Sequence, residues 1–270
     1  MSEPVKKPIF RWAGGKSWLL KYLYKFLPDE YKNYHEPFLG GASIFIHLRP
    51  ERMSYLSDIN ADLINAYCEI QNNVEEVISI LKQFRNTEKE YYRIRDINFH
   101  KSVEKAAQFI FLNRTSFNGI YRVNLNGNYN VPYGFKKYKK LFDFGKFREA
   151  SVLLKEAQLS CFDFNNSLKY VNEGDLIFLD PPYTESPIKN GFIKYNHTLF
   201  SWDDQIRLAS FIEKVIRKKA FFILTNAKHE AVKDLFGRFC SPISIRRANV
   251  IGGKNAKRGV IEEYIFTNTI

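Results

Sequence analysis

The sequence predicts an α/β protein with a Rossmann-like sheet into which a helical and β-hairpin domain is inserted. Short apolar runs, such as residues 176–179, alternate with helical patterns, as in parallel sheets whose strands are buried on both faces. The glycine pair Gly40-Gly41 follows the first predicted strand and precedes a helical pattern, which is how a Rossmann-like sheet begins. Residues 82–155 interrupt the alternation with helical patterns and a hairpin turn signal.

The composition fits a folded chain with a polyanionic partner. The chain has 270 residues, enough for one large α/β domain with an insertion or for two domains. Hydrophobic residues make up 45%, which excludes a disordered chain. The formal net charge is +12, and residues 82–155 contain 16 Lys or Arg against 6 Asp or Glu. A basic segment inside a folded chain favours nucleic acid as a partner over a merely lysine-rich surface.

The lack of a signal-peptide pattern and the cysteine spacing predict a cytoplasmic protein without a membrane span. No apolar run approaches 18 residues, and residues 1–12 lack the apolar region of a signal peptide. Cys68, Cys161 and Cys240 lie too far apart for a disulfide framework or a zinc pattern. The five histidines show no metal-ligand spacing. We therefore expect a reducing compartment, no membrane association and no metal.

The first candidate ligand-binding stretch is FRWAGGKSW, residues 10–18. Gly14 and Gly15 permit a tight loop with exposed backbone N–H groups. Lys16 begins a helix-like pattern, and G-G-K resembles a phosphate loop but lacks the G-x-x-x-x-G-K-[ST] spacing. A cation and an aromatic ring beside glycines equally suit a small ligand with a carboxylate, so both interpretations stand at this point.

A strand that ends in a glycine turn is predicted for residues 31–43, followed by a helix from about Ser43. A short strand at residues 53–56 follows, and Asp58 lies 18 residues after Gly40. An acid at about this distance from the glycine turn typically binds ribose hydroxyls. The alternative is an Asx turn or a helix N-cap, because Asp58 and Asn60 both precede a helical pattern.

The basic segment contains the features expected of a nucleic-acid contact. Helices are predicted at residues 72–84 and 102–112, the second capped by Ser102. An Asn-Gly pair at residues 126–127 is a strong hairpin signal. The hairpin's Arg and Asn side chains, with Phe117 and Tyr121, suit base-edge contacts and insertion into a base stack. The KKYKK run at residues 136–140 suits phosphate contact, although each single residue is equally compatible with an ordinary surface hairpin.

The strand at residues 176–179 ends in the motif D-P-P-Y, residues 180–183. In open α/β sheets, ligands bind at the carboxyl ends of the strands, so we expect Asp58 and Asp180 to lie near the same edge of the sheet. The prolines remove two backbone donors and stiffen the turn. The Asp180 carboxylate and the Asp180 or Pro181 carbonyl can accept both N–H bonds of a planar group that carries an NH₂, and Tyr183 can stack on its ring. The alternative is a strand followed by a proline turn without a function.

The remaining patterns complete the predicted sheet. Further strands and helices are expected at residues 159–162, 203–218, 220–224, 243–247 and 263–267, the last two as an antiparallel pair around a basic Gly252-Gly253 loop. Residues 184–201 are a long polar loop with several aromatic side chains, which we expect to act as a lid over the site.

Together these motifs resemble the Dam-type DNA adenine methyltransferases, the alpha-group family with a DPPY motif. The resemblance covers essentially the whole chain in the family's order, through FRWAGGK, EPFLGGAS, SDIN, NRTSFNGIYRVNLNGNYNVPYG, DPPY and a basic C-terminal strand pair. DPPY alone is shared with other amino-methyltransferases, whereas the NR…FNG…R…NVPYG block is far more specific. The resemblance implies a Rossmann-like methyltransferase sheet with an inserted helical and β-hairpin target-recognition domain.

The resemblance implies S-adenosyl-L-methionine as the cofactor. Trp12 and Lys16 would lie against its methionine end, Asp58 would bind the ribose, and Asp163 or Phe164 would flank the adenine. Because this cofactor has no phosphate to cradle, the carboxylate interpretation of Lys16 replaces the phosphate one. The expected cofactor-binding residues are Trp12, Ala13, Gly14, Lys16, Glu36, Phe38, Gly40, Gly41, Ala42, Ser43, Asp58, Ile59, Asn60, Asp163, Phe164 and Asp180.

The implied reaction is direct transfer of a methyl group from the sulfonium to the exocyclic N6 amino group of adenine in double-stranded DNA. The adenine must leave the duplex, which costs a few kcal/mol. Asp180 and a proline-turn carbonyl would orient the amino group and counter the positive charge that develops on it. The expected catalytic residues are Asp180, Pro181, Pro182 and Tyr183.

The recognition hairpin would read the target. The resemblance places base contacts at Arg122, Ile120 and Pro132, while Phe117 would fill or wedge the gap left by the base. GATC is one target that suits the hairpin, although family members with other targets share much of it. The expected DNA-binding residues are Arg114, Phe117, Asn118, Gly119, Ile120, Arg122, Asn124, Asn130, Pro132, Lys137, Lys139 and Lys140.

We expect the catalytic domain to comprise residues 1–70 and 157–270, with residues 71–156 as the inserted target-recognition domain. A monomer in solution is expected, and a cognate restriction endonuclease is a candidate partner.

Three rival activities are weighed. A cytosine-C5 methyltransferase needs a nucleophilic cysteine, typically after proline, and none of the three cysteines follows a proline. A cytosine-N4 enzyme uses a similar turn, usually with serine where Asp180 stands, and is the best enzymatic alternative. An inert DNA-binding relative is the alternative from another class, against which the intact D-P-P-Y motif argues.

Overall fold

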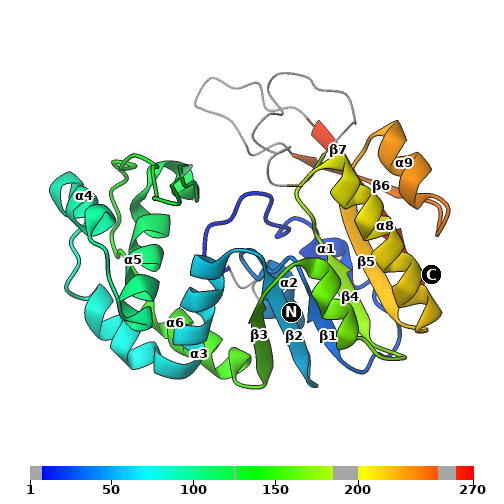
Figure 1. Ribbon diagram of the computed structural model, residues 1–270, viewed down its shortest axis with the longest axis horizontal. Coiled ribbons are helices and arrows are strands. Elements are labelled where there is room, and N and C mark those ends of the chain that lie inside the picture. Colours follow the sequence, from blue (N-terminus) through cyan, green and yellow to red (C-terminus); the bar gives the residue numbers. More distant parts are fainter. Residues whose placement is uncertain (1–7, 125, 185–199, 249–259) are drawn as a thin grey trace. The chain divides into compact units, whose positions relative to one another are not determined.

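The computed structural model describes residues 8–124, 126–184, 200–248 and 260–270. The chain forms two compact units, which we call the first unit (Met1–Ser17 and Leu39–Phe162) and the second unit (Trp18–Phe38 and Asp163–Ile270). The strands form a seven-stranded sheet in the order β3-β2-β1-β4-β5-β7-β6 (Figure 1). This confirms the prediction of an α/β protein with a Rossmann-like sheet.

The first unit consists mainly of helices beside a parallel strand pair. Its elements are α2 (Ser43–Leu48), β2 (Ser54–Asp58), α3 (Ala61–Leu81), α4 (Glu88–Asp96), α5 (Ser102–Thr115), η1 (Phe117–Gly119), α6 (Phe144–Leu154) and β3 (Ala157–Cys161). Strands β2 and β3 run parallel. Helices α3 and α5 lie side by side (Figure 1), and the apolar face of α5 is buried.

The helical segments differ from the prediction in two respects. The helix predicted at residues 72–84 is the second part of the longer α3, which has one non-helical residue, Asn73, at its kink. The predicted Ser102 cap is wrong. Ser102 is already the first residue of α5, and Lys101 occupies the N-cap position without a side-chain hydrogen bond. A serine caps a helix only from the extended N-cap position, where its oxygen can reach the free N–H groups.

Helices α4 and α6 were not predicted from the sequence. Helix α4 buries only Tyr91 and Ile94, so its apolar pattern is short. Its start depends instead on Thr87, whose hydroxyl accepts the Glu90 N–H at 3.2 Å.

The predicted hairpin is confirmed. Gly127 has φ +79°, the left-handed conformation that the turn requires. The Gly127 N–H donates to the Asn124 carbonyl at 2.9 Å, and the Asn130 N–H donates to the Arg122 carbonyl at 3.1 Å. Two isolated antiparallel bridges, Val123 to Tyr129 and Ser116 to Tyr133, hold the arms together.

The domain boundaries proposed at residues 70/71 and 156/157 stay a prediction. Helix α3 (Ala61–Leu81) crosses the first boundary, with its kink at Asn73. Strand β3 begins at Ala157, where the insertion was expected to end.

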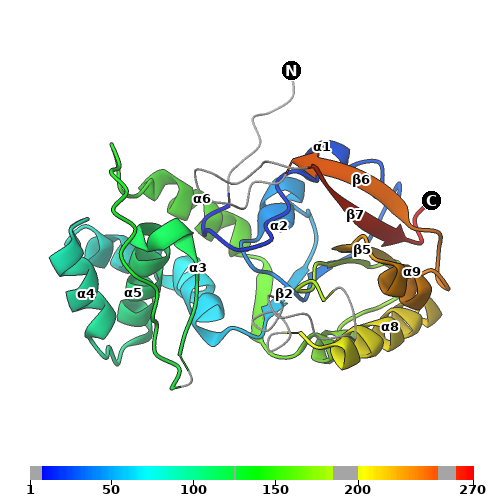
Figure 2. The same cartoon turned by 90° about the horizontal axis from the view of Figure 1, so that it is seen from above.

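The second unit contains the other five strands. Its elements are α1 (Leu20–Leu23), β1 (Tyr34–Glu36), η2 (Phe164–Lys169), β4 (Leu176–Leu179), α8 (Trp202–Arg217), β5 (Phe221–Ala227), α9 (Glu230–Phe236), β6 (Ile243–Ala248) and β7 (Val260–Thr267). Strand β4 runs parallel to β1 and β5, whereas β7 runs antiparallel to β5 and β6 (Figure 2). The antiparallel closing pair is therefore confirmed.

Helix α8 packs its apolar face against the sheet of the second unit. It begins with a capping box in which Ser201 and Asp204 each bond the other's backbone N–H. Its buried residues Phe211 and Ile212 belong to the same hydrophobic core cluster as Ile177 and Leu179 of β4. The strand residues Leu176–Leu179 are buried throughout, as the unbroken apolar run predicted.

Two predictions fall outside the described residues. The expected lid at residues 184–201 consists mostly of residues 185–199, and the Gly252-Gly253 loop lies within residues 249–259. Within the described ranges, no helix combines the length and the apolar character needed to cross a lipid bilayer.

Asp175, just before β4, joins three segments of the second unit. Its carboxylate accepts hydrogen bonds from His35 Nε2 at 2.9 Å, from the Asn33 N–H and side-chain amide at 3.0 Å, and from the Asn172 N–H at 2.9 Å. Burial raises the pKa of this carboxyl, but the His35 bond and the backbone N–H groups outweigh it, and the pKa is lowered.

We predict that Asp175→Asn lowers the free energy of unfolding by about 3 kcal/mol at neutral pH, because it breaks a buried paired network. Since folding lowers the pKa of Asp175, its stabilisation is present above the unfolded-state pKa and is lost as the pH falls through the folded-state pKa. The difference in the free energy of unfolding between wild type and Asp175→Asn, measured with urea, should therefore become smaller as the pH falls from 7 to about 3. If this difference in free energy does not change with pH, the ionised carboxylate of Asp175 is not the source of the stabilisation.

Candidate functional site

The D-P-P-Y motif begins directly after β4, and Asp180 is held from the neighbouring strand. Strands β4 and β5 pair in parallel with Leu179 opposite Leu224, which brings Thr225 beside Asp180. The Thr225 hydroxyl donates to Asp180 Oδ1 at 2.8 Å. This bond fixes one carboxylate oxygen of Asp180, and the next residue, Pro181, is buried.

Tyr183 is anchored through its hydroxyl. Its phenol donates to Glu263 Oε2 at 2.5 Å. Burial, followed by the negative charges of Asp180 and Glu263, raises the pKa of Tyr183 well above its ordinary value. The phenol therefore keeps its proton at physiological pH and acts as a hydrogen-bond donor, not as a base.

Besides Asp180, four predicted cofactor-binding residues lie in the second unit. Glu36 is buried at the end of β1, where its Oε2 accepts the Tyr34 hydroxyl at 2.7 Å. Phe38 stacks on Phe164, with ring centroids 5.3 Å apart and an interplanar angle of 29°. An aromatic plate thus lies one residue beyond Asp163.

Asp163 is oriented by a guanidinium. Its Oδ1 accepts the Asn165 N–H at 3.0 Å and Arg207 Nη2 at 2.7 Å. The Arg207 guanidinium also lies over the Phe164 ring, 5.1 Å from the centroid. Arg207 was not predicted from the sequence, because it comes from α8, 44 residues away from Asp163.

In the first unit, Asp58 at the end of β2 ties down the glycine turn. Its Oδ2 accepts the Gly40 N–H at 2.9 Å, and its Oδ1 accepts the Asn60 N–H at 3.0 Å. Burial raises the pKa of Asp58, opposed by these backbone bonds. Asn60 caps α3 by accepting the Leu63 N–H at 2.9 Å. The Asx turn and the N-cap are therefore real.

The loop after residue 11 is packed on this turn. Gly40 has φ +46°, and a Cβ there would lie 2.7 Å from Trp12 Cδ1. Lys16 is only 3% exposed, and its Nζ donates to the Gly14 carbonyl at 2.8 Å. Of the other predicted residues here, Gly41, Ala42 and Ser43 are buried, while Ala13, Gly14 and Ile59 are exposed.

The hairpin contacts this loop through Tyr121. The Tyr121 ring stacks on Trp12, with centroids 5.7 Å apart and an interplanar angle of 27°. Its hydroxyl donates to Asp62 Oδ2 at 2.7 Å. Asn113 adds a second link, since its side chain bonds both the N–H and the carbonyl of Arg11. Tyr121 was expected, with Phe117, to suit insertion into a base stack, whereas the structure places its ring on Trp12. Asn113 was not among the predicted site residues.

The predicted base-contacting residues lie on the exposed part of the hairpin. Phe117 and Ile120 are 51% and 40% exposed, which is unusual for side chains of this size. Arg122 Nε donates to Asn130 Oδ1 at 2.7 Å, so two predicted residues form one unit. Asn124 Oδ1 accepts the N–H groups of Asn126 and Asn128, which gives it a role in shaping the turn. Asn118, Arg122 and Pro132 are exposed, whereas Gly119 is buried.

The basic run at residues 136–140 is anchored by its tyrosine. The Tyr138 hydroxyl donates to the Arg114 carbonyl at 2.7 Å, and the Arg114 guanidinium lies 4.3 Å from the centre of the Tyr138 ring. Arg114 Nε also donates to the Leu141 carbonyl at 2.8 Å. Lys137 and Lys139 remain exposed. Arg114 thus orders the run whose lysines face solvent.

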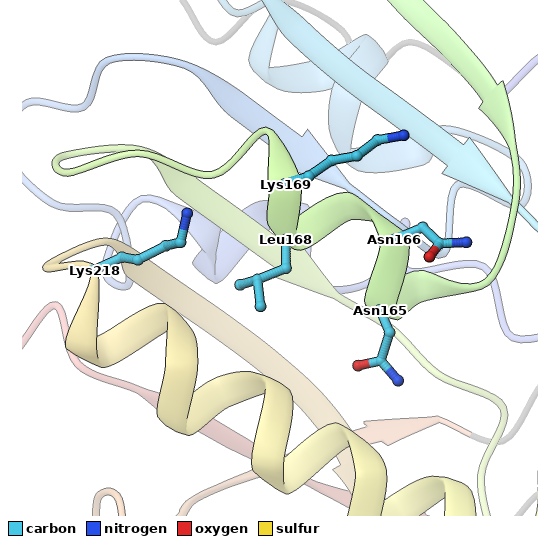
Figure 3. Close-up of a pocket in the computed structure, with 5 residues that line it drawn as sticks. All are labelled: Asn165, Asn166, Leu168, Lys169 and Lys218. Atoms are coloured by element: carbon cyan, nitrogen blue, oxygen red, sulfur yellow. The ribbon is translucent and has the colours of Figure 1, made fainter.

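A hollow of about 380 Å³ in the second unit opens beside η2, lined by Asn165, Asn166, Leu168, Lys169 and Lys218 (Figure 3). Lys218 Nζ donates to the Val171 carbonyl at 2.7 Å. In Figure 3 the Lys169 side chain points away from Lys218. The lining carries amides and cations but no acid or nucleophile, so we assign it no part in the chemistry.

The structure thus gathers the predicted residues into two sets. The second unit holds the D-P-P-Y motif with Glu36, Phe38, Asp163 and Phe164. The first unit holds the loop at residues 12–16, the glycine turn, Asp58 and the hairpin. The chain passes directly from one set to the other at Phe38–Leu39 and Phe162–Asp163. The expectation that Asp58 and Asp180 share one sheet edge stays a prediction.

Comparisons with known proteins assign this arrangement to one family. The profile of the family described as D12 class N6 adenine-specific DNA methyltransferase matches residues 12–248. The Type II methyltransferase M1.LlaDCHI of Lactococcus lactis subsp. cremoris is 34% identical, over 97% of this chain and 95% of its own. The Type II methyltransferase M.MjaIII of Methanocaldococcus jannaschii is 36% identical, over 96% of this chain and 98% of its own. The DNA adenine methylase of Escherichia coli K12 is 28% identical, over 93% and 92%.

We predict that Gly40→Ala destabilises the protein more than Gly14→Ala. Both glycines have positive φ, but a Cβ at Gly14 meets no atom within 4 Å, whereas one at Gly40 meets the rigid Trp12 indole. We expect a loss of about 1 kcal/mol for Gly14→Ala and about 3 kcal/mol for Gly40→Ala, measured by denaturant unfolding. Equal losses would show that the contact with Trp12 contributes nothing.

Proposed function

Because the chain belongs to the D12 class N6 adenine-specific DNA methyltransferases, we propose that it moves a methyl group from S-adenosyl-L-methionine to the N6 amino group of an adenine turned out of duplex DNA. The observation that carries this proposal is the anchored D-P-P-Y motif, with Asp180 held by Thr225 and Tyr183 held by Glu263. Membership of an adenine-specific class decides against both the cytosine-N4 and the cytosine-C5 activities.

Each unit, taken by itself, offers polar groups that suit a part of this cofactor. In the first unit, Asp58 offers oxygens for ribose hydroxyls, and Lys16 offers an ammonium for a carboxylate. In the second unit, Asp163 offers an acceptor for an adenine amino group, and Phe164 belongs to an aromatic pair beside it. When bound, S-adenosyl-L-methionine supplies an electrophilic methyl group on its sulfonium.

Asp180 and the proline turn would orient the target amino group. An exocyclic NH₂ has two N–H donors, and the Asp180 carboxylate with the Asp180 or Pro181 carbonyl offers two acceptors. These bonds draw electron density toward the nitrogen and counter the positive charge that develops on it. The ring of Tyr183 would stack on the base. Because the phenol of Tyr183 keeps its proton, Tyr183 would position the base without taking up a proton.

The base has to leave the helix to reach this motif, at a cost of a few kcal/mol. Phe117 is exposed at the start of the hairpin, held by a bond from its N–H to the Pro132 carbonyl at 2.9 Å. An exposed aromatic side chain on a fixed backbone suits insertion into the gap left by the base.

Arg122 would read the target, and the lysines of the basic run would follow the backbone. Asn130 holds Arg122 Nε and so directs the rest of the guanidinium. A guanidinium can donate two bonds to guanine O6 and N7. GATC, which contains a guanine beside the adenine, is the target we propose. Exposed Lys137 and Lys139 suit phosphate contact.

Partners and location follow from the proposed substrate. Two of the relatives above are Type II methyltransferases by name, so we propose a cognate restriction endonuclease as a partner in the cell. We also propose a monomer that works on duplex DNA in the cytoplasm.

We predict that Asp180→Ala abolishes methyl transfer while leaving affinity for the cofactor product S-adenosylhomocysteine largely intact, because the proposed role of this acid is at the target amino group. Tyr183→Ala should also lose activity, through lost stacking, but less completely. Single-turnover assays with mass analysis of the methylated nucleoside would measure both variants and identify the modified base.

The control is Asp203→Ala, which removes an exposed acid from the start of α8 in the same unit. It should leave transfer unchanged. Near-normal transfer by Asp180→Ala would contradict the role of Asp180, and methylcytosine as the product would contradict the proposed function.

A further prediction separates base readout from phosphate contact. Arg122→Ala should cost about 1–3 kcal/mol of binding and relax discrimination at one base pair. Lys139→Ala should weaken binding to all duplexes about equally and reduce the salt slope by about one unit. Binding and methylation rates on duplexes with single base-pair substitutions, at several salt concentrations, would test both.

Each variant serves as the control for the other. If Arg122→Ala slows every duplex by the same factor, Arg122 is an anchor and the readout lies elsewhere. A salt slope that neither variant changes would argue against phosphate contact by the basic run.

A further inference from the structure

We propose that Glu263 is a positioning residue for methyl transfer, which fixes the ring of Tyr183 in the orientation that receives the target adenine. The inference rests on the proposed function, because that function places Tyr183 against the base. It concerns the second unit alone, since Tyr183, Glu263 and Arg247 all belong to it.

The phenol of Tyr183 and the carboxylate of Glu263 form a short bond of 2.5 Å between residues 80 positions apart. The proton stays on the phenol, because burial and the charges of Asp180 and Glu263 raise the pKa of Tyr183. A neutral donor facing a carboxylate acceptor makes a charge-assisted hydrogen bond, which is stronger than a neutral one.

Stability alone does not account for Glu263. Its side chain is 0% exposed within strand β7, where an apolar residue would avoid the cost of desolvating a charge. The charge is compensated by Arg247 on β6, which donates through Nε to Glu263 Oε1. The Arg247 guanidinium in turn lies 5.8 Å from the centre of the Trp18 ring. This pairing makes a buried carboxylate tolerable at the one place where it meets Tyr183.

The neighbouring residues of the same two strands show the ordinary alternative. Glu262 and Arg246 pair directly across β6 and β7, and Arg246 Nε donates to Glu262 Oε1 at 2.9 Å. Glu262 also accepts from Lys228 at 2.6 Å. That cluster lies at the surface, where Arg246 is 80% exposed. Side chains alternate along a strand, so Glu263 points to the opposite face.

Two strands that are neighbours in the sheet, β5 and β7, therefore hold the Asp180 and Tyr183 side chains of the motif. Thr225 on β5 bonds Asp180, and Glu263 on β7, opposite Ala227 of β5, bonds Tyr183. The Tyr183 ring is held at one end by its backbone and at the other by Glu263. The plane of the ring is thus set before the base arrives, and a displacement of the ring would misplace the amino group relative to Asp180.

The experiment compares single-turnover rates of methyl transfer at saturating DNA and cofactor. Tyr183→Phe removes only the hydroxyl and keeps the ring. We expect it to slow transfer by about 10- to 100-fold, as loss of a hydrogen bond to a charged group implies. Affinity for S-adenosylhomocysteine should stay within about twofold of wild type, because the change alters the orientation of the base and not cofactor binding.

Glu263→Gln keeps an acceptor for the phenol but removes the charge, so its rate should lie between those of wild type and Tyr183→Phe. In the Tyr183→Phe background, Glu263→Gln should have little further effect, because the bond is already absent. Glu262→Gln makes the same substitution on the opposite face of the strand and should transfer at the wild-type rate.

Thermal unfolding of all variants separates positioning from folding. A Tyr183→Phe variant that unfolds like wild type and transfers within twofold of the wild-type rate would overturn the inference. The inference would also be overturned if the rate losses of Tyr183→Phe and Glu263→Gln multiplied in the double variant. In both cases the proposed function would stand, since wild type would still produce N6-methyladenine. Absence of methyladenine from wild type itself would refute the proposed function instead.

Discussion

A carboxylate that is removed from water needs hydrogen-bond donors, and in this protein the donors come from distant parts of the chain. Asp58 takes its donors from the glycine turn and from the start of α3. Asp180 takes one from Thr225 on the next strand, and Glu263 takes donors from Tyr183 and Arg247. Each acid therefore joins segments that the sequence separates, and the arrangement of the site follows from satisfying these charges.

The same requirement divides the acids by role. Asp58, Asp163 and Asp180 are the acids that we propose for ligand binding. Asp175, in contrast, is surrounded by His35, Asn33 and Asn172, and it holds strand ends together. The three acids proposed for ligand binding stand at the carboxyl ends of β2, β3 and β4, whereas Asp175 precedes β4, so the end of the strand at which an acid stands distinguishes the two kinds here.

The hairpin shows how one short segment serves two purposes. Side chains alternate along its arm, so Tyr121 stacks on Trp12 while its neighbour Arg122 is exposed and bonds Asn130. Arg114, expected to contact DNA, is half-buried and orders the basic run through Tyr138 and Leu141. A cation in a basic segment can thus stabilise the local fold, leaving contact with a partner to exposed neighbours such as Lys139.

The sequence by itself determined the α/β class, the strand before D-P-P-Y, the glycine turn, the Asn-Gly hairpin and the adenine-specific methyltransferase family, because each depends on local patterns or on motifs. It did not indicate α4, the true N-cap of α5, the partners Thr225, Glu263 and Arg207, or the contact of Tyr121 with Trp12. Only the tertiary structure decided those. A polar side chain becomes a partner through strand register and side-chain direction, and contacts between residues 44 to 80 positions apart leave no local pattern in the chain.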